Sequence, residues 1–475
     1  MPEFFRHALT MFTGSVIAQV IPFAVSPILT RLYRPEDFGI YSTVLALAGI
    51  LSVATAFRFE LSVVLPQRDE DAAILVRLAL VISLATTLVF LIGLPFVQGF
   101  LVDSHRMKGI GAWIYVVPLL ACLIALQQVA SFFANRFTAY RDIALSNVAQ
   151  QGSTAAVAIL SGIGRLAANG LIVSRIAGLL VGIAVIAGRL RGRLPLLTAK
   201  VTLNKMREHA RSYRQFPLFN VPYSFVGVFS KEFLILAFTA VGQLETAGFY
   251  GLARVVLTAP INFLTSSMSQ VFYREAALNV DTEVFRNLVY RVMKFLAISL
   301  VPLFSLALGW ADQIFSFAFG AQWRQAGVFA AYLIPLAVLS LFTSWPERIF
   351  EVRRRQSWAL GIQVVFDVSS VILVFTLLHE ALTPEKVLCG YVAVQIGYHL
   401  TYLAVVFRLI GLSKRKYIEL LSICIGLGTL ILFTHAMLDR FSSPMILRLG
   451  METALAVGIT CAGIVFHRRK GDFVL

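Results

Sequence analysis

The chain has 475 residues, of which 58% are hydrophobic and 14% charged, and its mean hydropathy is +0.80. Soluble domains carry about 25% charged and about 45–50% apolar residues, so this composition excludes a soluble enzyme and a disordered scaffold. The formal net charge is +16. In a soluble protein that charge would suggest nucleic acid, but in a membrane protein basic residues mark the cytoplasmic loops. The composition predicts an all-α polytopic membrane protein with no nucleic-acid partner.

A run of about 20 apolar residues is long enough to cross a bilayer as a helix. Such runs recur along the whole chain and predict about 14 transmembrane helices. They lie near residues 8–30, 38–60, 74–98, 111–134, 143–163, 168–188, 217–240, 247–271, 290–310, 326–345, 357–379, 386–408, 417–437 and 447–467. A basic break at 189–216 divides them into groups of six, six and two. The second half of this break, residues 204–216, has the pattern of an amphipathic helix lying on the inner leaflet.

The basic residues set the predicted orientation. With the N-terminus in the cytoplasm, the inner segments hold 29 Lys and Arg and the outer loops hold 9. This asymmetry predicts a multi-pass membrane protein with both termini cytoplasmic. The domains expected from this plan are an N-lobe (1–188), a cytoplasmic linker (189–216), a C-lobe (217–409), and a C-terminal helix pair with its tail (410–475).

A short motif occurs twice. Residues 36–42 and 245–251 both read Glu-x-x-Gly-x-Tyr-small, at an offset of 209 residues, and each opens the second helix of its group. Two six-helix bundles of the same orientation form the parallel-repeat design of many secondary transporters, in which the substrate site lies in a central cavity between the lobes. The alternative is that the motif only marks the entry from a loop into a helix.

Three basic residues remain inside predicted spans: Arg175, Lys231 and Arg254. They lie about 10–14 Å from the outer ends of their helices. Ionisable residues at membrane depth usually face a cavity or a partner. We therefore expect a cationic, substrate-binding chamber in the outer half of the membrane.

Polar residues recur every three or four positions on the first, seventh and eighth helices and predict a polar stripe along the cavity; packing between helices would explain the same pattern. The stripe comprises Gln19, Asn220, Ser224, Thr258 and Asn262.

Other ionisable residues leave two interpretations open. Arg58 and Glu60, at the inner end of the second helix, are either an interfacial ion pair or a gate. Glu232, Asp367 and His399 are candidates for ion coupling, although interhelical hydrogen bonds would also account for Asp367 and His399. The candidate coupling ion is H⁺ or Na⁺.

The sequence carries no motif for other chemistry. It has no Walker motif, no metal-ligand spacing and no third glycine after Gly162 and Gly164. The four cysteines lie in apolar runs and are interpreted as core residues. We therefore expect a non-enzyme without metal or cofactor.

Three stretches resemble the polysaccharide branch of the multidrug/oligosaccharidyl-lipid/polysaccharide exporter superfamily, the O-antigen flippase type. They are residues 30–39 (TRLYRPEDFG), residues 58–66 (RFELSVVLP) followed by an acidic segment, and residues 220–276 from NVPYS through GFYGLAR to SQVFYREA. The resemblance implies two six-helix bundles around a V-shaped cavity. It also implies a flippase that moves an undecaprenyl-diphosphate-linked oligosaccharide from the cytoplasmic to the periplasmic leaflet by alternating access, for O-antigen, capsule or exopolysaccharide synthesis.

The diphosphate would bind the predicted cationic chamber, and membrane lipids, a polysaccharide polymerase and a chain-length regulator are candidate partners. Two alternatives stay open: a cation-coupled multidrug exporter of the same superfamily, and a membrane polysaccharide polymerase or glycosyltransferase.

Overall fold

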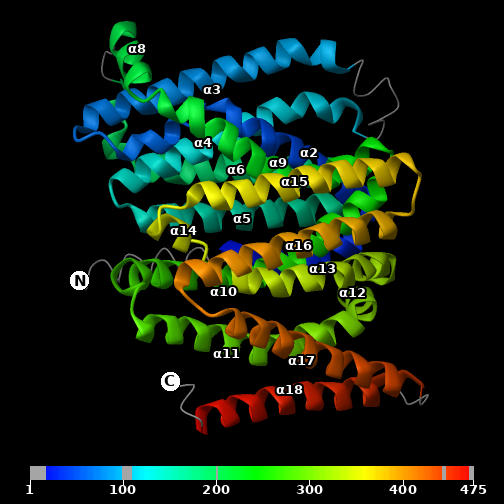
Figure 1. Cartoon of the computed structure of the whole chain (residues 1–475). Coiled ribbons are helices and arrows are strands. Elements are labelled where there is room, and N and C mark those ends of the chain that lie inside the picture. Colours follow the sequence, from blue (N-terminus) through cyan, green and yellow to red (C-terminus); the bar gives the residue numbers. More distant parts are fainter. Residues whose placement is uncertain (1–17, 99–109, 199–201, 441–444, 470–475) are drawn as a thin grey trace. The chain divides into compact units, whose positions relative to one another are not determined.

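The computed structural model describes residues 18–98, 110–198, 202–440 and 445–469, and these residues form helices and connecting turns without a β-strand. Eleven described helices are long and apolar enough to cross a membrane, and a shorter apolar helix spans Ala18–Leu32. Figure 1 shows long helices connected by short turns. The fold is therefore that of an all-α polytopic membrane protein, as the composition predicted.

The chain divides into two compact units, Met1–Gly251 and Leu252–Leu475. Beyond the helix Ala18–Leu32, the first unit contains the following elements: α2 (Pro35–Thr55), η1 (Phe59–Val64), α3 (Asp69–Gln98), η3 (Gly111–Tyr115), α4 (Val116–Arg136), α5 (Tyr140–Ile163), α6 (Ala167–Arg189), η4 (Arg191–Arg193), α7 (Pro195–Thr198), α8 (Leu203–Ser212), η5 (Phe216–Asn220), α9 (Val221–Ala240) and the first turns of α10 (Leu244–Asn279).

The second unit contains the rest of α10 and the elements that follow it: α11 (Glu283–Gly309), α12 (Ala311–Phe319), η6 (Ala321–Trp323), α13 (Arg324–Thr343), α14 (Ile349–Val352), α15 (Gln356–His379), α16 (Pro384–Ile410), α17 (Lys414–Arg440) and α18 (Met445–Arg469). A described helix of membrane length overlaps each predicted apolar run from 38–60 onward. The first run, 8–30, lies partly outside the described residues.

The least apolar predicted span is a helix, α5, but it is not among the eleven apolar spans. It carries Asn147, Gln150 and Gln151. Gln150 is buried, and the carbonyl oxygen of the same residue accepts a hydrogen bond from Thr154 Oγ1 at 2.8 Å. α5 packs along α6, and the Gln150 side chain lies 3.1 Å from the position of a Cβ on Gly182 of α6. A polar residue buried against a neighbouring helix lowers the hydropathy of the run, so hydropathy alone is a weak signal here.

The amphipathic segment of the linker forms α8, which ends at Ser212 and is therefore shorter than the predicted 204–216. α8 packs against α3, and His209 Nε2 lies 3.3 Å from Asp71 Oδ1. His209 of α8 thus lies beside an acidic residue at the start of α3.

The two copies of the repeated motif contact each other within the first unit. A Cβ on Gly39 would lie 1.8 Å from the Leu244 carbonyl oxygen, and a Cβ on Gly248 would lie 2.0 Å from the Pro35 carbonyl oxygen. Gly39 and Gly248, which the 209-residue offset pairs, therefore lie against each other, and Gly251 lies against Ser42 in the same way. Only glycine permits this approach of backbone to backbone at the starts of α2 and α10.

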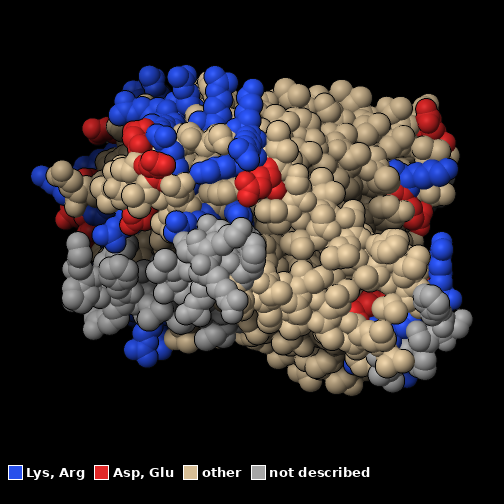
Figure 2. Space-filling view, turned by 60° about the horizontal axis from the view of Figure 1, so that its bottom comes forward, with Lys and Arg blue, Asp and Glu red and all other residues tan. Residues whose placement is uncertain are grey.

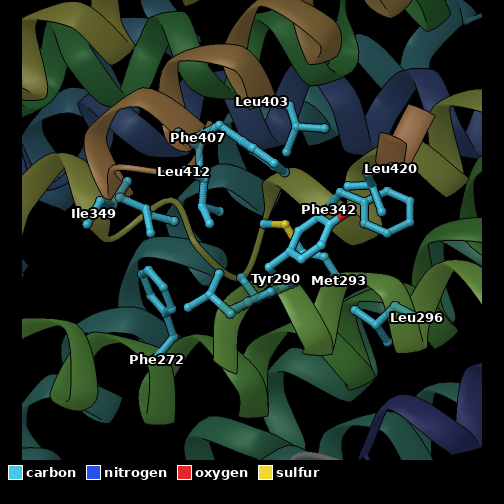
Figure 3. Packing of buried hydrophobic residues seen from close by; sticks show 14 of the residues in the cluster. Phe272, Tyr290, Met293, Leu296, Phe342, Ile349, Leu403, Phe407, Leu412 and Leu420 are labelled. Carbon is cyan, nitrogen blue, oxygen red and sulfur yellow. The ribbon is translucent and has the colours of Figure 1, made fainter. Parts of the chain in front are cut away.

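The core of the second unit is assembled from six helical segments. Phe272 of α10, Met293 of α11 and Phe342 of α13 meet side chains of α14, α16 and α17, as Figure 3 shows. The cluster includes Trp345, which contacts Phe272 edge to face at 5.2 Å between ring centroids. Aromatic and aliphatic packing of this kind fixes the relative positions of these helices.

The surface matches a protein held in lipid. On the face shown in Figure 2, charged side chains gather near the edges, and a wide area carries none. Large apolar side chains such as Phe96, Val365 and Phe375 are more than half exposed on their helices. Apolar surface of this extent is the surface that a bilayer covers.

Candidate functional site

Arg175 is a half-buried cation in the middle of α6, in the first unit. Its Nε atom is buried without a hydrogen-bond partner, and no carboxylate lies within ion-pair distance among the described residues. The Tyr41 hydroxyl of α2 is close enough to Arg175 to interact with it electrostatically. A cation at membrane depth without a counter-ion attracts anions strongly because the surroundings screen charge poorly.

The two other cations predicted for the chamber, Lys231 and Arg254, lie on different helices and differ in exposure. Lys231 is exposed on α9, and Glu232 beside it is half-buried. Arg254 is half-buried on α10, and its backbone carbonyl accepts a hydrogen bond from Thr258 Oγ1 at 2.8 Å. Arg175 and Lys231 belong to the first unit and Arg254 to the second, so a chamber shared by all three stays a prediction.

The predicted polar stripe lies on accessible positions. Thr258 and Asn262 are exposed on α10, and Gln19 is exposed at the start of the helix Ala18–Leu32. Asn220 and Ser224 are half-buried where η5 leads into α9. Thr258 bonds to its own helix, so its hydroxyl does not need a neighbouring helix to be satisfied.

Arg58 and Glu60 form an ion pair in the connection between α2 and α3. They lie in this connection and not on α2 because α2 ends at Thr55, earlier than the sequence predicted. Arg58 Nη1 lies 3.3 Å from Glu60 Oε1 and 3.4 Å from Gln128 Oε1. Glu60 is 2% exposed, and its Oε2 has no partner in the described chain. Burial raises the pKa of the Glu60 carboxyl, while the Arg58 guanidinium opposes that rise.

The backbone around this pair is strained. Phe57 and Arg58 both have positive φ, at 46° and 59°. Left-handed conformations of residues other than glycine cost about 1 kcal/mol or more each and persist where the surrounding structure holds them. A buried ion pair with an unsatisfied oxygen on a strained turn is compatible with an interfacial ion pair and with a gate, so both interpretations stay open.

The candidates for ion coupling in the second unit occupy different environments. His399 Nδ1 lies 2.9 Å from Thr343 Oγ1 of α13, so its ring joins two helices. Asp367 is half-buried on α15. The bond to Thr343 is the interhelical contact that the sequence left open as the alternative for His399.

The first stretch of family resemblance forms the connection between the helix Ala18–Leu32 and α2. Tyr33 Oη donates to the Ala158 carbonyl at 2.7 Å, and burial together with Asp37 raises the pKa of Tyr33 to about 12. The Asp37 carboxylate accepts from the backbone N–H of Arg34 and from that of Ala168, at 2.9 and 3.0 Å. These residues join the start of α2 to α5 and α6.

The sequence did not indicate a polar cluster at one end of α17 and α18. Glu452 of α18 is 1% exposed and accepts a hydrogen bond from Trp310 Nε1 at 2.6 Å. His435 of α17 approaches the same carboxylate at 3.1 Å. The available signal was Glu452 itself, the one carboxylate within the predicted span 447–467.

Metal-binding groups of three or more His, Cys, Asp or Glu do not occur among residues 18–98, 110–198, 202–440 and 445–469.

Comparison with solved structures shows a shared fold. The chain is similar to "Lipid II flippase MurJ, inward closed conformation", with TM-score 0.75 and 11% identity over 98% of this chain and 99% of that chain. It is also similar to an inward-facing multidrug resistance MATE family transporter of the MOP superfamily, with TM-score 0.56 and 16% identity over 85% and 94% of the two chains. A MOP superfamily transporter from Pyrococcus furiosus aligns with TM-score 0.51 and 16% identity over 86% and 95%.

No curated protein matches the sequence. A family model described as "Polysaccharide biosynthesis protein" matches residues 28–328, well over half of the chain. This match includes the paired glycines of the repeat, the Arg58–Glu60 pair and all three predicted chamber cations. The chain therefore belongs to this family of polysaccharide biosynthesis proteins.

Proposed function

We propose that this protein is a flippase that moves an undecaprenyl-diphosphate-linked oligosaccharide from the cytoplasmic to the periplasmic leaflet of the bacterial inner membrane. Membership of the polysaccharide biosynthesis family and the flippase-like fold support a transporter of lipid-linked material. The observation that carries the proposal is Arg175, a cation at membrane depth with no counter-ion in the described part of the chain.

The chemistry of the substrate head group suits such a residue. A diphosphate carries two to three negative charges, roughly, and a guanidinium can donate two parallel hydrogen bonds to its oxygens. Lys231 would add a point charge, and Arg254 a second guanidinium. The exposed hydroxyl and amide groups of Thr258 and Asn262 would serve the sugar, since hydroxyl-rich ligands exchange hydrogen bonds with such side chains.

Alternating access would release the head group on the far side of the membrane. The excess of basic residues in the inner segments supports cytoplasmic termini. A reporter fused to the C-terminus should therefore be active only if it is a cytoplasmic reporter.

The test compares Arg175→Ala and Arg175→Lys with Lys386→Ala in cells that depend on this protein for surface polysaccharide. Lys386 is an exposed cation at the start of α16, so it controls for loss of one positive charge. A lost charge-assisted hydrogen bond is worth about 1.5–3 kcal/mol, so we expect transport by Arg175→Ala to fall roughly 10- to 100-fold. Lipid-linked repeat units should then accumulate in the cytoplasmic leaflet.

Normal surface polysaccharide from Arg175→Ala at equal membrane abundance would refute the role of Arg175. Export of organic cations without any effect on lipid-linked units would instead favour a multidrug exporter. Units that reach the periplasm but stay unpolymerised would favour a polymerase.

A further inference from the structure

A group of polar side chains connects three helices of the second unit. Trp310, at the end of α11, donates its indole N–H to Glu452 Oε2 at 2.6 Å. His435 Nδ1 lies 3.1 Å from the same oxygen and 3.2 Å from Oε1. The His435 and Trp310 rings meet edge to face, with 5.5 Å between centroids. One carboxylate thus bridges α18, α17 and α11, which lie side by side in Figure 1.

The carboxylate and the imidazole differ in their access to the surroundings. The Glu452 side chain is 1% exposed, whereas that of His435 is 24% exposed. The His435 ring lies against the backbone of Gly309, where a Cβ would come within 3.0 Å of it. The imidazole therefore occupies a defined position between the surface and the buried carboxylate.

Most of the charged groups on the helices that carry the pair, and on α12 that follows Trp310, form ion pairs of their own. Arg448 of α18 has its guanidinium carbon 5.6 Å from the Trp310 ring centroid and forms an ion pair with Asp439 of α17. On α12, Asp312 is paired with Arg324 at 2.8 Å. Arg440 is exposed at the end of α17.

A net charge on the pair is therefore set by its own protons. If His435 is neutral and Glu452 is ionised, one negative charge stays buried, and Arg448, four residues away on α18, is already paired with Asp439. A buried charge that is not fully compensated is costly in a medium of low dielectric constant. One added proton makes the pair an imidazolium and a carboxylate, or two neutral groups, and both forms are electrically neutral. The geometry suits this proton because Nδ1 and the carboxylate oxygens are at hydrogen-bond distance.

We propose that His435 and Glu452 form a proton-binding site that fastens the terminal helices α17 and α18 to the end of α11. The proton reaches the site through the partly exposed imidazole and is held between Nδ1 and the carboxylate. No other covalent bond changes. The indole N–H of Trp310 fixes the carboxylate, so occupation of the site is reported by the indole next to it.

The experiment uses the full-length protein in lipid nanodiscs, without substrate. Tryptophan fluorescence is titrated from about pH 4 to about pH 9, the range that covers carboxyl and imidazole groups, and the signal of Trp310→Phe is subtracted to isolate Trp310 among the five tryptophans. An imidazolium quenches an adjacent indole. We expect the Trp310 signal to fall as the pH falls, with a single midpoint.

The variants define the site. His435→Gln should abolish the titration of the Trp310 signal, and Glu452→Gln should change that titration, because it removes the carboxylate that shares the proton with Nδ1. Gly309→Ala, which displaces the ring without removing it, should also shift the midpoint and serves if His435→Gln does not fold. His379→Gln is the matched control, because His379 is exposed at the end of α15, and it should titrate like the wild type.

A Trp310 signal that does not change with pH would overturn the proposal, as would a titration that persists unchanged in His435→Gln. Since the readout needs no substrate, neither result depends on whether the protein is a flippase. A loss of transport in Arg175→Ala with an intact Trp310 titration would likewise separate the two sites.

Discussion

The contact between the repeated glycines makes a quantitative prediction for Gly39→Ala. The new Cβ would lie 1.8 Å from the Leu244 carbonyl oxygen, whereas ordinary contacts between such atoms are roughly 3.5 Å. The obstacle is backbone, so no side-chain rotation can relieve it and the starts of α2 and α10 must separate. Overpacking typically costs about 1–3 kcal/mol, and we expect a loss of about 3 kcal/mol in the free energy of unfolding.

The assay is chemical unfolding in detergent micelles, with Gly227→Ala as the matched control. Gly227 lies within α9, and nothing is within 4 Å of its added Cβ, so alanine there should be neutral or stabilising by up to about 1 kcal/mol.

Gly248→Ala should cost about as much as Gly39→Ala, because its Cβ meets the Pro35 carbonyl oxygen at 2.0 Å. The double variant should cost clearly less than the sum, since one separation relieves both clashes. Two results would refute a single contact between the starts of α2 and α10: a double variant whose loss equals the sum of the two single losses, or an unfolding free energy of Gly39→Ala equal to that of Gly227→Ala.

Three further predictions concern contacts within single units. Arg353 Nη2 donates to Asp281 Oδ1 at 2.7 Å and lowers the pKa of that carboxyl. The stabilisation of the folded state by this ion pair is therefore present above the ordinary carboxyl pKa, and it is lost as the pH falls through the lower pKa of Asp281 in the folded protein. Asp281→Asn should unfold with less change between neutral and acidic pH, and an unchanged acid dependence would contradict this. Tyr33→Phe removes the hydroxyl that donates to the Ala158 carbonyl and should lower the unfolding free energy by about 1 kcal/mol. An unchanged unfolding free energy in the same denaturation assay would show that this hydrogen bond contributes nothing. Arg136 donates to three backbone carbonyls in the connection between α2 and α3; Arg136→Ala should cost about 2–3 kcal/mol and speed proteolysis there, and Arg136→Lys should restore little because one ammonium cannot span these acceptors. Proteolysis of Arg136→Ala at the wild-type rate would show that other contacts hold this connection.

Much of the fold could be predicted because hydropathy is a local property. The apolar runs identified described helices from α2 to α18, and α5 gave the weakest signal because it carries polar residues, of which Gln150 is buried against α6. The offset of 209 residues indicated a duplication, which the reciprocal contacts of Gly39 and Gly248 support. The end of α2 was misplaced because Phe57 and Arg58 adopt left-handed conformations that no propensity indicates.

The candidate site was only partly accessible from the sequence. Arg175 is recognisable as a charge in an apolar run, and only the structure shows that its Nε is buried without a hydrogen-bond partner among the described residues. His399 looked like a coupling residue, and its contact with Thr343 joins positions 56 residues apart.

The sequence by itself determined the membrane class and the approximate positions of the helical spans, because these follow from which residues are neighbours along the chain. The tertiary structure decided which polar groups meet. Glu452 is 142 residues from Trp310 and 17 from His435, so their contact depends on how α11, α17 and α18 pack. A proton can be held there only because that packing excludes water from the carboxylate and leaves the imidazole within reach of the surface.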